Sequence, residues 1–178
     1  VADRIGRTLV LGPRRTPALD ALVRRVRRAI EERLELPAGA AYGKVSTPAA
    51  DLGHTVLFAA LATGGCLHLV SAARAADPGG LAAYFRANPV DVLKVVPSHL
   101  SALLTAADRA AVLPRRTLVL GGEASRRAWV DELRALAPGC AVVNHYGPTE
   151  TTVGALTHRV GEAEGDAEEG DAEGTVPL

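Results

Sequence analysis

The sequence lacks the features that would place it at once in a functional class. Its 20 lysines and arginines are balanced by 20 aspartates and glutamates, which gives no net charge at neutral pH. Composition therefore offers no case for a nucleic acid or an anionic membrane surface as partner. No apolar stretch approaches the roughly 20 residues that span a bilayer, and the first residues lack the apolar segment of a signal peptide.

Cysteine is almost absent. Cys66 and Cys140 are far apart, lie in apolar surroundings and lack the spacing of metal ligands. Buried free thiols in a reducing cytosol are the expected state, so the sequence favours a cytoplasmic protein. The histidines at 54, 68, 99 and 158 are scattered singly, and a structural role is the favoured interpretation for each.

One apparent nucleotide motif fails on inspection. The stretch "AYGKVS" ends in Gly43-Lys44 like a phosphate-binding loop, but Ala38 replaces the required glycine and Val45 replaces the Ser or Thr that holds Mg²⁺. No GxSxG elbow supports a hydrolase either.

What the 178 residues do contain is an alternating pattern, long enough for one domain with a core. Strand-like stretches are expected at 42–47, 66–71, 90–97, 116–123 and 140–147, and helix-like stretches at 17–36, 51–65, 78–88, 98–107 and 125–137. This alternation predicts an α/β fold, a largely parallel sheet with helices on both faces.

Polar or glycine-rich segments follow four of these strands, at 47–51, 96–98, 121–123 and 144–150. In open parallel sheets, ligands bind outside the carboxyl ends of the strands, so these segments predict a ligand cleft. Ordinary strand-end turns are the alternative interpretation of the same pattern. Gly121 and Gly122 would let backbone approach a flat ligand, because no Cβ intervenes.

The segment from Asn144 to Gly154, "NHYGPTETTVG", is more specific. Tyr146 offers a flat face for stacking, and Gly147-Pro148 fixes a sharp turn. Thr149 supplies a hydroxyl for a phosphate oxygen and Glu150 a carboxylate for Mg²⁺.

These residues resemble the Tyr-Gly-Pro-Thr-Glu motif of the adenylation domains of nonribosomal peptide synthetases, members of the adenylate-forming superfamily. The stretches "NHYGPTETTVGALTH", "LVLGGEA", "LKVVPSHLSALL" and "LFAALATGGCLHLVS" fit that family, and the resemblance covers about residues 19–178. It implies ATP-dependent activation of an amino acid to an aminoacyl adenylate and pyrophosphate, after which the thiol of a phosphopantetheinyl carrier protein takes the acyl group.

The resemblance also assigns residues. It implies that Tyr146 stacks on adenine, that Asn144 orients the adenine side, and that Gly121, Gly122 and Glu123 line the adenine slot. Thr149 would contact the α-phosphate and Glu150 would hold Mg²⁺, and these two are the implied catalytic residues. The implied partners are carrier-protein and condensation domains of the same synthetase.

The matching positions of the amino acid pocket are Asp51, Leu52, Thr55, Lys94, Val119, Gly121, His145, Val153 and Gly154. Asp51 could pair with the substrate ammonium. Lys94 stands in an apolar strand, where an ammonium is costly without an anion or water. His145 could add a second positive or donor group. A pocket with one anion and two potential cations suits an amino acid with an acidic side chain. These pocket residues resemble those of aspartate-activating adenylation domains. A Lys94 that reaches solvent and a His145 that acts as a spacer are the alternatives.

The chain also departs from the family. The Gly/Ser/Thr-rich phosphate loop, the ribose-binding Asp and the C-terminal subdomain with its catalytic Lys have no counterpart here, so we expect the isolated chain to be nearly inactive. Both ends look cut. The expected organisation is an unassigned lead-in (1–17), a partial adenylation core (18–160), an acidic flexible loop (161–174) and the start of a truncated strand (175–178).

Two other functions stay open from the sequence. A degenerate, non-catalytic adenylation-like module would explain the missing loop, and an acyl-CoA ligase fragment would share the fold. The combination of Tyr146, Thr149 and Glu150 speaks against the first, and Asp51 speaks against the second. Whether β-hydroxyaspartate is accepted is also open.

Overall fold

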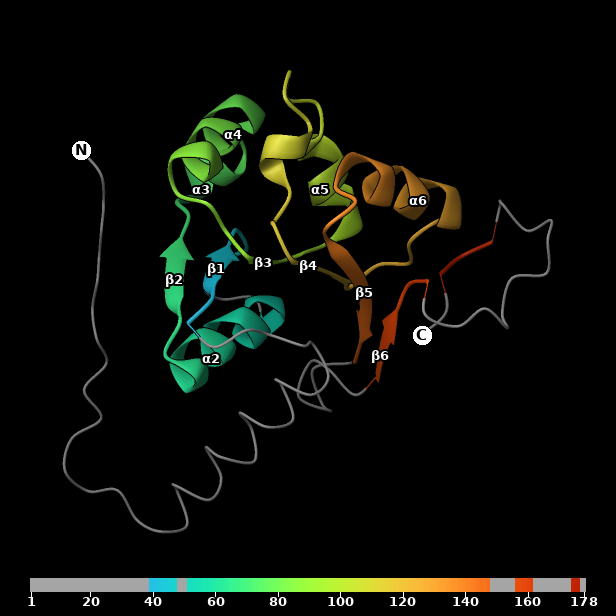
Figure 1. Cartoon of the computed structure of the whole chain (residues 1–178), viewed down its shortest axis with the longest axis horizontal. Coiled ribbons are helices and arrows are strands. Elements are labelled where there is room, and N and C mark those ends of the chain that lie inside the picture. The colour runs from blue at the N-terminus through green and yellow to red at the C-terminus, as the bar shows by residue number, and fades with distance from the viewer. Residues whose placement is uncertain (1–38, 48–50, 148–155, 162–173, 177–178) are drawn as a thin grey trace, which may run out of the picture.

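The computed structural model of the chain describes residues 39–47, 51–147, 156–161 and 174–176. Figure 1 shows the arrangement of the elements. Along the chain they are β1 (Ala41–Lys44), η1 (Asp51–Gly53), α2 (His54–Thr63), β2 (Cys66–Leu69), α3 (Ala72–Ala75), α4 (Pro78–Ala87), β3 (Val92–Val95), α5 (Pro97–Leu103), η2 (Ala110–Val112), β4 (Thr117–Gly121), α6 (Arg127–Leu136), β5 (Ala141–Tyr146) and β6 (Leu156–Arg159).

The strands form a single sheet in the order β2-β1-β3-β4-β5-β6. The first five strands run parallel to their neighbours, and β6 pairs with β5 in the antiparallel direction. The prediction of an α/β fold with a largely parallel sheet is therefore confirmed. Strands β3 and β4 are buried along their whole length, as expected for parallel strands covered on both faces.

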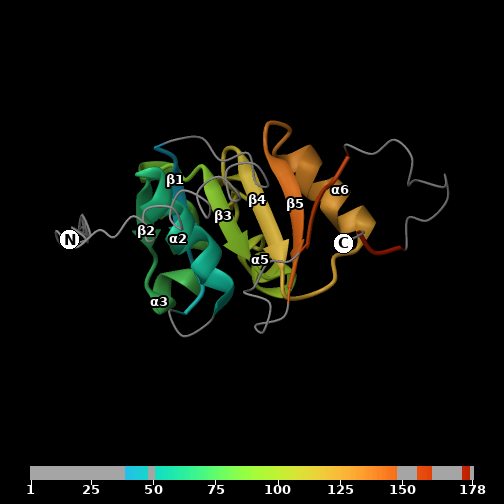
Figure 2. The ribbon, with the colours of Figure 1, turned by 90° about the horizontal axis from the view of Figure 1, so that it is seen from below.

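Helix α2 covers one face of the sheet (Figure 2). It packs on one apolar residue from each of four neighbouring strands, and the cluster comprises Ala40, Tyr42, Val56, Ala59, Ala60, Val92, Val119 and Val143. Because side chains alternate along a strand, the residues directly before and after each of these strand residues point to the other face of the sheet.

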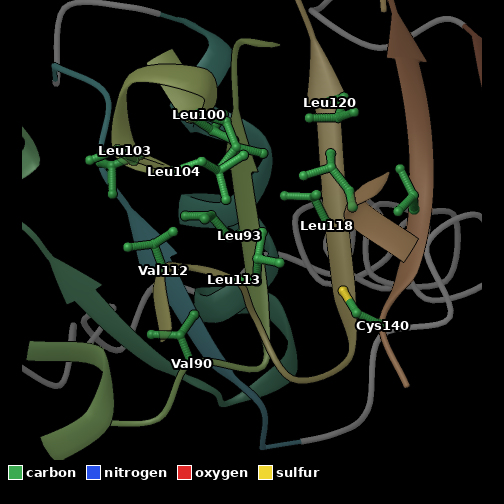
Figure 3. Close-up of a cluster of buried hydrophobic side chains, with 14 of the residues drawn as sticks. Val90, Leu93, Leu100, Leu103, Leu104, Val112, Leu113, Leu118, Leu120 and Cys140 are labelled. Carbon is green, nitrogen blue, oxygen red and sulfur yellow. The ribbon is translucent and has the colours of Figure 1, made fainter. Parts of the chain in front are cut away.

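Helices α3, α4, α5 and α6 lie on the opposite side of the sheet from α2 (Figure 1). Leu93 of β3 and Leu118 and Leu120 of β4 point to this side and are almost fully buried. Figure 3 shows them packed with side chains that include Leu100 and Leu103 of α5. This larger core packs the sheet against α3 to α6. Polar side chains near the strand ends lie on the other face, which is covered by α2.

The predicted elements match those found, with differences at their ends. Gly64 ends α2 in the left-handed conformation, at φ 69°, which confirms the predicted glycine stop. The strand expected over 42–47 covers only Ala41–Lys44. Short α3 and the antiparallel β6 were not predicted. The helix expected over 17–36, most of the lead-in and most of the acidic loop lie outside the described residues.

The prediction that both cysteines are buried is wrong for one of them. Cys140 is buried but Cys66 is exposed, because β2 is an edge strand with only one neighbour. Within the part of the chain that the structure describes, no helix is both long and apolar enough to cross a membrane.

Candidate functional site

The carboxyl ends of four adjacent parallel strands, β1, β3, β4 and β5, meet at one edge of the sheet. The described parts of the four polar segments, around Thr47, Ser98, Glu123 and Tyr146, lie at these ends or directly after them. The convergence expected from the sequence is therefore present, and Figure 2 shows the strands side by side.

Lys94 is the centre of a polar cluster on the α2 face. Its side chain is 1% exposed, and it faces α2 because it stands two residues after Val92 in β3. The Nζ atom lies 2.9 Å from Oγ1 of Thr55 and 2.8 Å from Nδ1 of His145. The alternative of a lysine that reaches solvent is thus excluded, and three predicted pocket residues are in direct contact.

The contact between Lys94 and His145 brings together the two groups that the sequence assigned to the cationic side of the pocket. When Lys94 is an ammonium, which has only donors, Nδ1 of His145 accepts this hydrogen bond and the ring proton lies on Nε2. The two roles expected of His145, a second positive charge or a donor, both stay predictions.

Gly121 and Gly122 close the cluster on the β4 side. A Cβ at Gly121 would lie 2.6 Å from the carbonyl oxygen of His145 and 3.6 Å from Cε of Lys94. Gly122 has a φ of +86°, and a Cβ there would approach Val96 at 3.2 Å and Leu52 at 3.8 Å. Neither position has room for a larger residue in its present backbone conformation. This agrees with a ligand slot whose wall is formed by backbone atoms at Gly121 and Gly122.

Val119 is placed differently from the polar residues. It is fully buried and belongs to the apolar cluster under α2, and it is the register partner of Lys94 in the neighbouring strand. It provides an apolar floor beside the Lys94 side chain. Its role toward a substrate stays a prediction.

Glu123 is held by α5. Its carboxylate accepts hydrogen bonds from the hydroxyl of Ser98 at 2.7 Å and from the amide of Ser98 at 2.8 Å. The hydroxyl bond first, and then the amide bond, lower the pKa of Glu123, although burial slightly opposes them. The carboxylate therefore fastens the turn after β4 to the start of α5. Ser98 had no assigned role, although its position after a strand was a usable signal.

Lys44 is a second buried lysine that sequence reasoning set aside with the failed phosphate motif. It is 4% exposed and is the register partner of Lys94. Its Nζ donates to the carbonyl and the hydroxyl of Ser46 and to the carbonyl of Thr47, each at 3.1 Å, and burial lowers its pKa. A Cβ at Gly53 would collide with Nζ. Lys44 thus holds the chain after β1 beneath η1.

Strand β5 ends in residues of two kinds. Tyr146 is 48% exposed, so its ring is accessible at the edge of the sheet and can take part in stacking. Asn144 is buried, and its Nδ2 donates to the carbonyl of Val176 at 3.3 Å. Asn144 points to the face opposite His145, and its expected effect on adenine stays a prediction.

Several predicted site residues cannot be placed. Thr149, Glu150, Val153 and Gly154 lie outside the described residues. Asp51 opens η1, but its side chain is not among the described parts. Within the described residues, no group of three or more His, Cys, Asp or Glu side chains could hold a metal ion. The Mg²⁺ role of Glu150 therefore stays a prediction.

The bonds from Ser98 to Glu123 predict a pH dependence. A carboxyl whose pKa is lowered on folding stabilises the protein above its unfolded pKa, and this stabilisation is lost as pH falls through the folded pKa. Glu123→Gln should therefore lower the thermal midpoint of the domain above about pH 4.5, and the difference should vanish at lower pH. We expect a shift of only about a few degrees, since the group is exposed.

The control is Glu132→Gln, which removes an exposed carboxylate of α6 that contacts Arg109 at 3.7 Å. A wild-type advantage over Glu123→Gln that stays constant down to about pH 3 would contradict the lowered pKa.

Comparison with known proteins adds independent support. Residues 19–176 match the family model described as AMP-binding enzyme. The chain is 35% identical over 126 residues to surfactin synthase subunit 2 of Bacillus subtilis (strain 168). This match covers 69% of this chain and 4% of that protein. It is 38% identical over 112 residues to the AMB antimetabolite synthetase AmbB of Pseudomonas aeruginosa, covering 62% of this chain and 8% of that protein.

Among solved structures, the nonribosomal peptide synthetase FmoA3 is similar, with a TM-score of 0.72 and 25% identity over 87% of this chain and 16% of that one. The chain thus spans only a small part of the relatives it matches. The family match extends over most of the chain, and the fold agrees with it. The chain belongs to the AMP-binding enzyme family.

Proposed function

We propose that the chain is part of the adenylation domain of a nonribosomal peptide synthetase, and that this domain activates L-aspartate with ATP. The aminoacyl group of the adenylate would pass to a phosphopantetheine thiol of a carrier-protein domain with release of AMP, and condensation domains would be further partners. The observation that carries the choice of substrate is the Lys94 ammonium, buried at the strand ends between Thr55 and His145.

Charge complementarity argues for an acidic side chain. An ammonium shielded from water interacts more strongly with an anion than one at the surface does. A substrate carboxylate beside Nζ would gain a charge-assisted hydrogen bond, and Nε2–H of His145 offers a second donor. A neutral or aromatic side chain would leave the ammonium with less compensation.

The ammonium and the side-chain carboxylate of the amino acid would lie on opposite sides of this slot. Asp51 is proposed to pair with the substrate ammonium, since it opens η1 just before Leu52 and Thr55. Val153 and Gly154 complete the proposed pocket. Lys44 would act indirectly, because its three hydrogen bonds hold the loop that leads into η1.

The nucleotide fits the neighbouring strand ends. Gly121 and Gly122 present backbone without side chains, and the exposed Tyr146 ring at the end of β5 can stack on a base. ATP would supply the α-phosphate to which the substrate carboxylate becomes joined, while the bond to the β-phosphate breaks and pyrophosphate leaves. Thr149 and Glu150 are proposed to bind that phosphate and Mg²⁺. The contribution of the described residues is binding and orientation, which can account for several kcal/mol of barrier.

The test is amino acid-dependent exchange of pyrophosphate with ATP, measured on the full-length protein that contains this chain. L-aspartate should give the highest kcat/KM, and its neutral isostere L-asparagine should be about 100-fold poorer, which corresponds to about 2.7 kcal/mol. Faster exchange with a neutral or aromatic amino acid would reject the aspartate assignment. A full-length protein without any exchange would favour the non-catalytic module, and activity with carboxylic acids that lack an amino group would favour the acyl-CoA ligase.

A further inference from the structure

A cluster of reactive side chains lies at the other side of the sheet, away from the candidate site. Cys66 and His68 of β2 are register partners of Ala41 and Gly43. They therefore point to the face opposite Lys44, towards α3 and α4. Strand β2 forms the edge of the sheet (Figure 1), so the thiol of Cys66 is exposed to solvent.

Three side chains of this cluster are joined in a row. The Sγ atom of Cys66 lies 3.7 Å from Nε2 of His68, and Nδ1 of His68 lies 3.0 Å from the hydroxyl of Tyr84 in α4. The guanidinium of Arg74 stacks 4.8 Å from the centre of the Tyr84 ring. A thiol, a histidine beside it and a third group that orients the histidine form the arrangement that activates a nucleophile.

The state of His68 suits the role of a base. Burial lowers the pKa of its imidazole, so the ring is mainly neutral at pH 7 and keeps a lone pair. When the ring proton is on Nδ1, it is donated to the Tyr84 oxygen, and the lone pair of Nε2 faces the thiol. This is the tautomer that the role of base requires, and the bond to Tyr84 holds the ring in the orientation that brings Nε2 near the thiol.

The second cysteine provides an internal contrast. Cys140 is buried, and burial raises the pKa of its thiol to about 11. Its Sγ donates a weak bond to the carbonyl of Ala141, at 3.6 Å. A buried thiol of this kind reacts slowly, because the thiolate is the nucleophilic form.

We propose that Cys66 is an activated thiol that reacts with small soft electrophiles, with His68 as its base and Tyr84 as a positioning residue. With iodoacetamide, the thiol proton passes to Nε2 of His68 while sulfur forms a bond to the CH₂ carbon. The carbon–iodine bond breaks, and iodide leaves with its electron pair. The product is a carbamidomethyl thioether, and no oxidant or reductant is needed.

The experiment follows iodoacetamide labelling of the full-length protein at pH 7, without ATP or amino acid. Trypsin separates the two thiols, since residues 45–74 contain only Cys66 and residues 135–159 only Cys140. Mass spectrometry of both peptides gives two rates from one sample. His68→Gln should slow labelling of Cys66 by about tenfold, less than the roughly 100-fold loss of an enzyme base, because water also reaches this thiol. Tyr84→Phe should slow it by about threefold, and neither change should affect Cys140.

The matched control is His158→Gln, which removes an imidazole from β6 at the opposite edge of the sheet. The proposal is overturned if the Cys66 rate in His68→Gln stays within twofold of wild type or rises, or if His158→Gln slows it equally. If His68→Gln slows labelling of Cys66 and Tyr84→Phe does not, His68 keeps its role as the base and the role of Tyr84 is overturned. Because labelling needs no adenylation, failure here is independent of the proposed function.

Discussion

Replacing Lys94 with alanine in the full-length protein should lower kcat/KM for L-aspartate by about 100-fold or more. The substrate carboxylate would then lie in a buried slot without its cation, and removal of one partner of a buried charge pair costs about 3–5 kcal/mol. One factor of ten corresponds to about 1.4 kcal/mol. Pyrophosphate exchange at a series of aspartate concentrations measures the effect.

Two comparisons separate recognition of charge from damage to the fold. Lys94→Met keeps most of the side-chain volume and should lose aspartate activation to the same extent. With L-asparagine, neither variant should lose more than about threefold, because the neutral amide depends less on an ammonium. Folded variants that retain wild-type kcat/KM for aspartate would show that Nζ does not contact the substrate side chain. Equal losses with both amino acids would assign Lys94 a structural role.

The larger elements of the fold could be predicted because local and long-range preferences agree. The segments of β3 and β4 are apolar runs, and a parallel sheet with helices on both faces requires such runs. What sequence could not provide is the place of a strand within the sheet. Cys66 is exposed because β2 is at an edge, and its apolar neighbours in sequence carry no information about that position.

The missed strand β6 has the same cause. Its residues, Leu156–Arg159, are mostly polar and only partly buried. They form a strand because β5 offers an unpaired edge, along which the segment pairs from Leu156 opposite Tyr146 to Arg159 opposite Val143. Pairing of this kind depends on the partner strand rather than on local propensity.

Sequence reasoning named residues of the candidate site, but it could not predict which of their side chains are in contact. Lys94 was visible as a charge within an apolar strand. Its partners lie 39 and 51 positions away, at Thr55 and His145, and only the strand order brings them together. Lys44 was overlooked because its hydrogen bonds are local and its burial becomes clear only beside Lys94.

Gly121→Ala should impair both halves of the proposed site at once. A Cβ at this position would lie 2.6 Å from the carbonyl oxygen of His145. Backbone on both sides makes the collision hard to relieve by a side-chain rotation, so β4 and β5 must separate locally. Extra volume in a packed region costs about 1–3 kcal/mol. We expect a loss of about 10- to 100-fold in kcat/KM for aspartate and a thermal midpoint lower by a few degrees.

The displacement acts at the end of β5, where His145 faces Lys94 and Tyr146 is proposed to stack on adenine. Gly121→Ala should therefore raise the KM for ATP as well as the KM for the amino acid, whereas Lys94→Ala should affect the amino acid alone. Gly139→Ala is the matched control, because a Cβ there meets no atom within 4 Å. If Gly121→Ala behaves like Gly139→Ala in thermal midpoint and in both KM values, close contact between the ends of β4 and β5 does not shape the site.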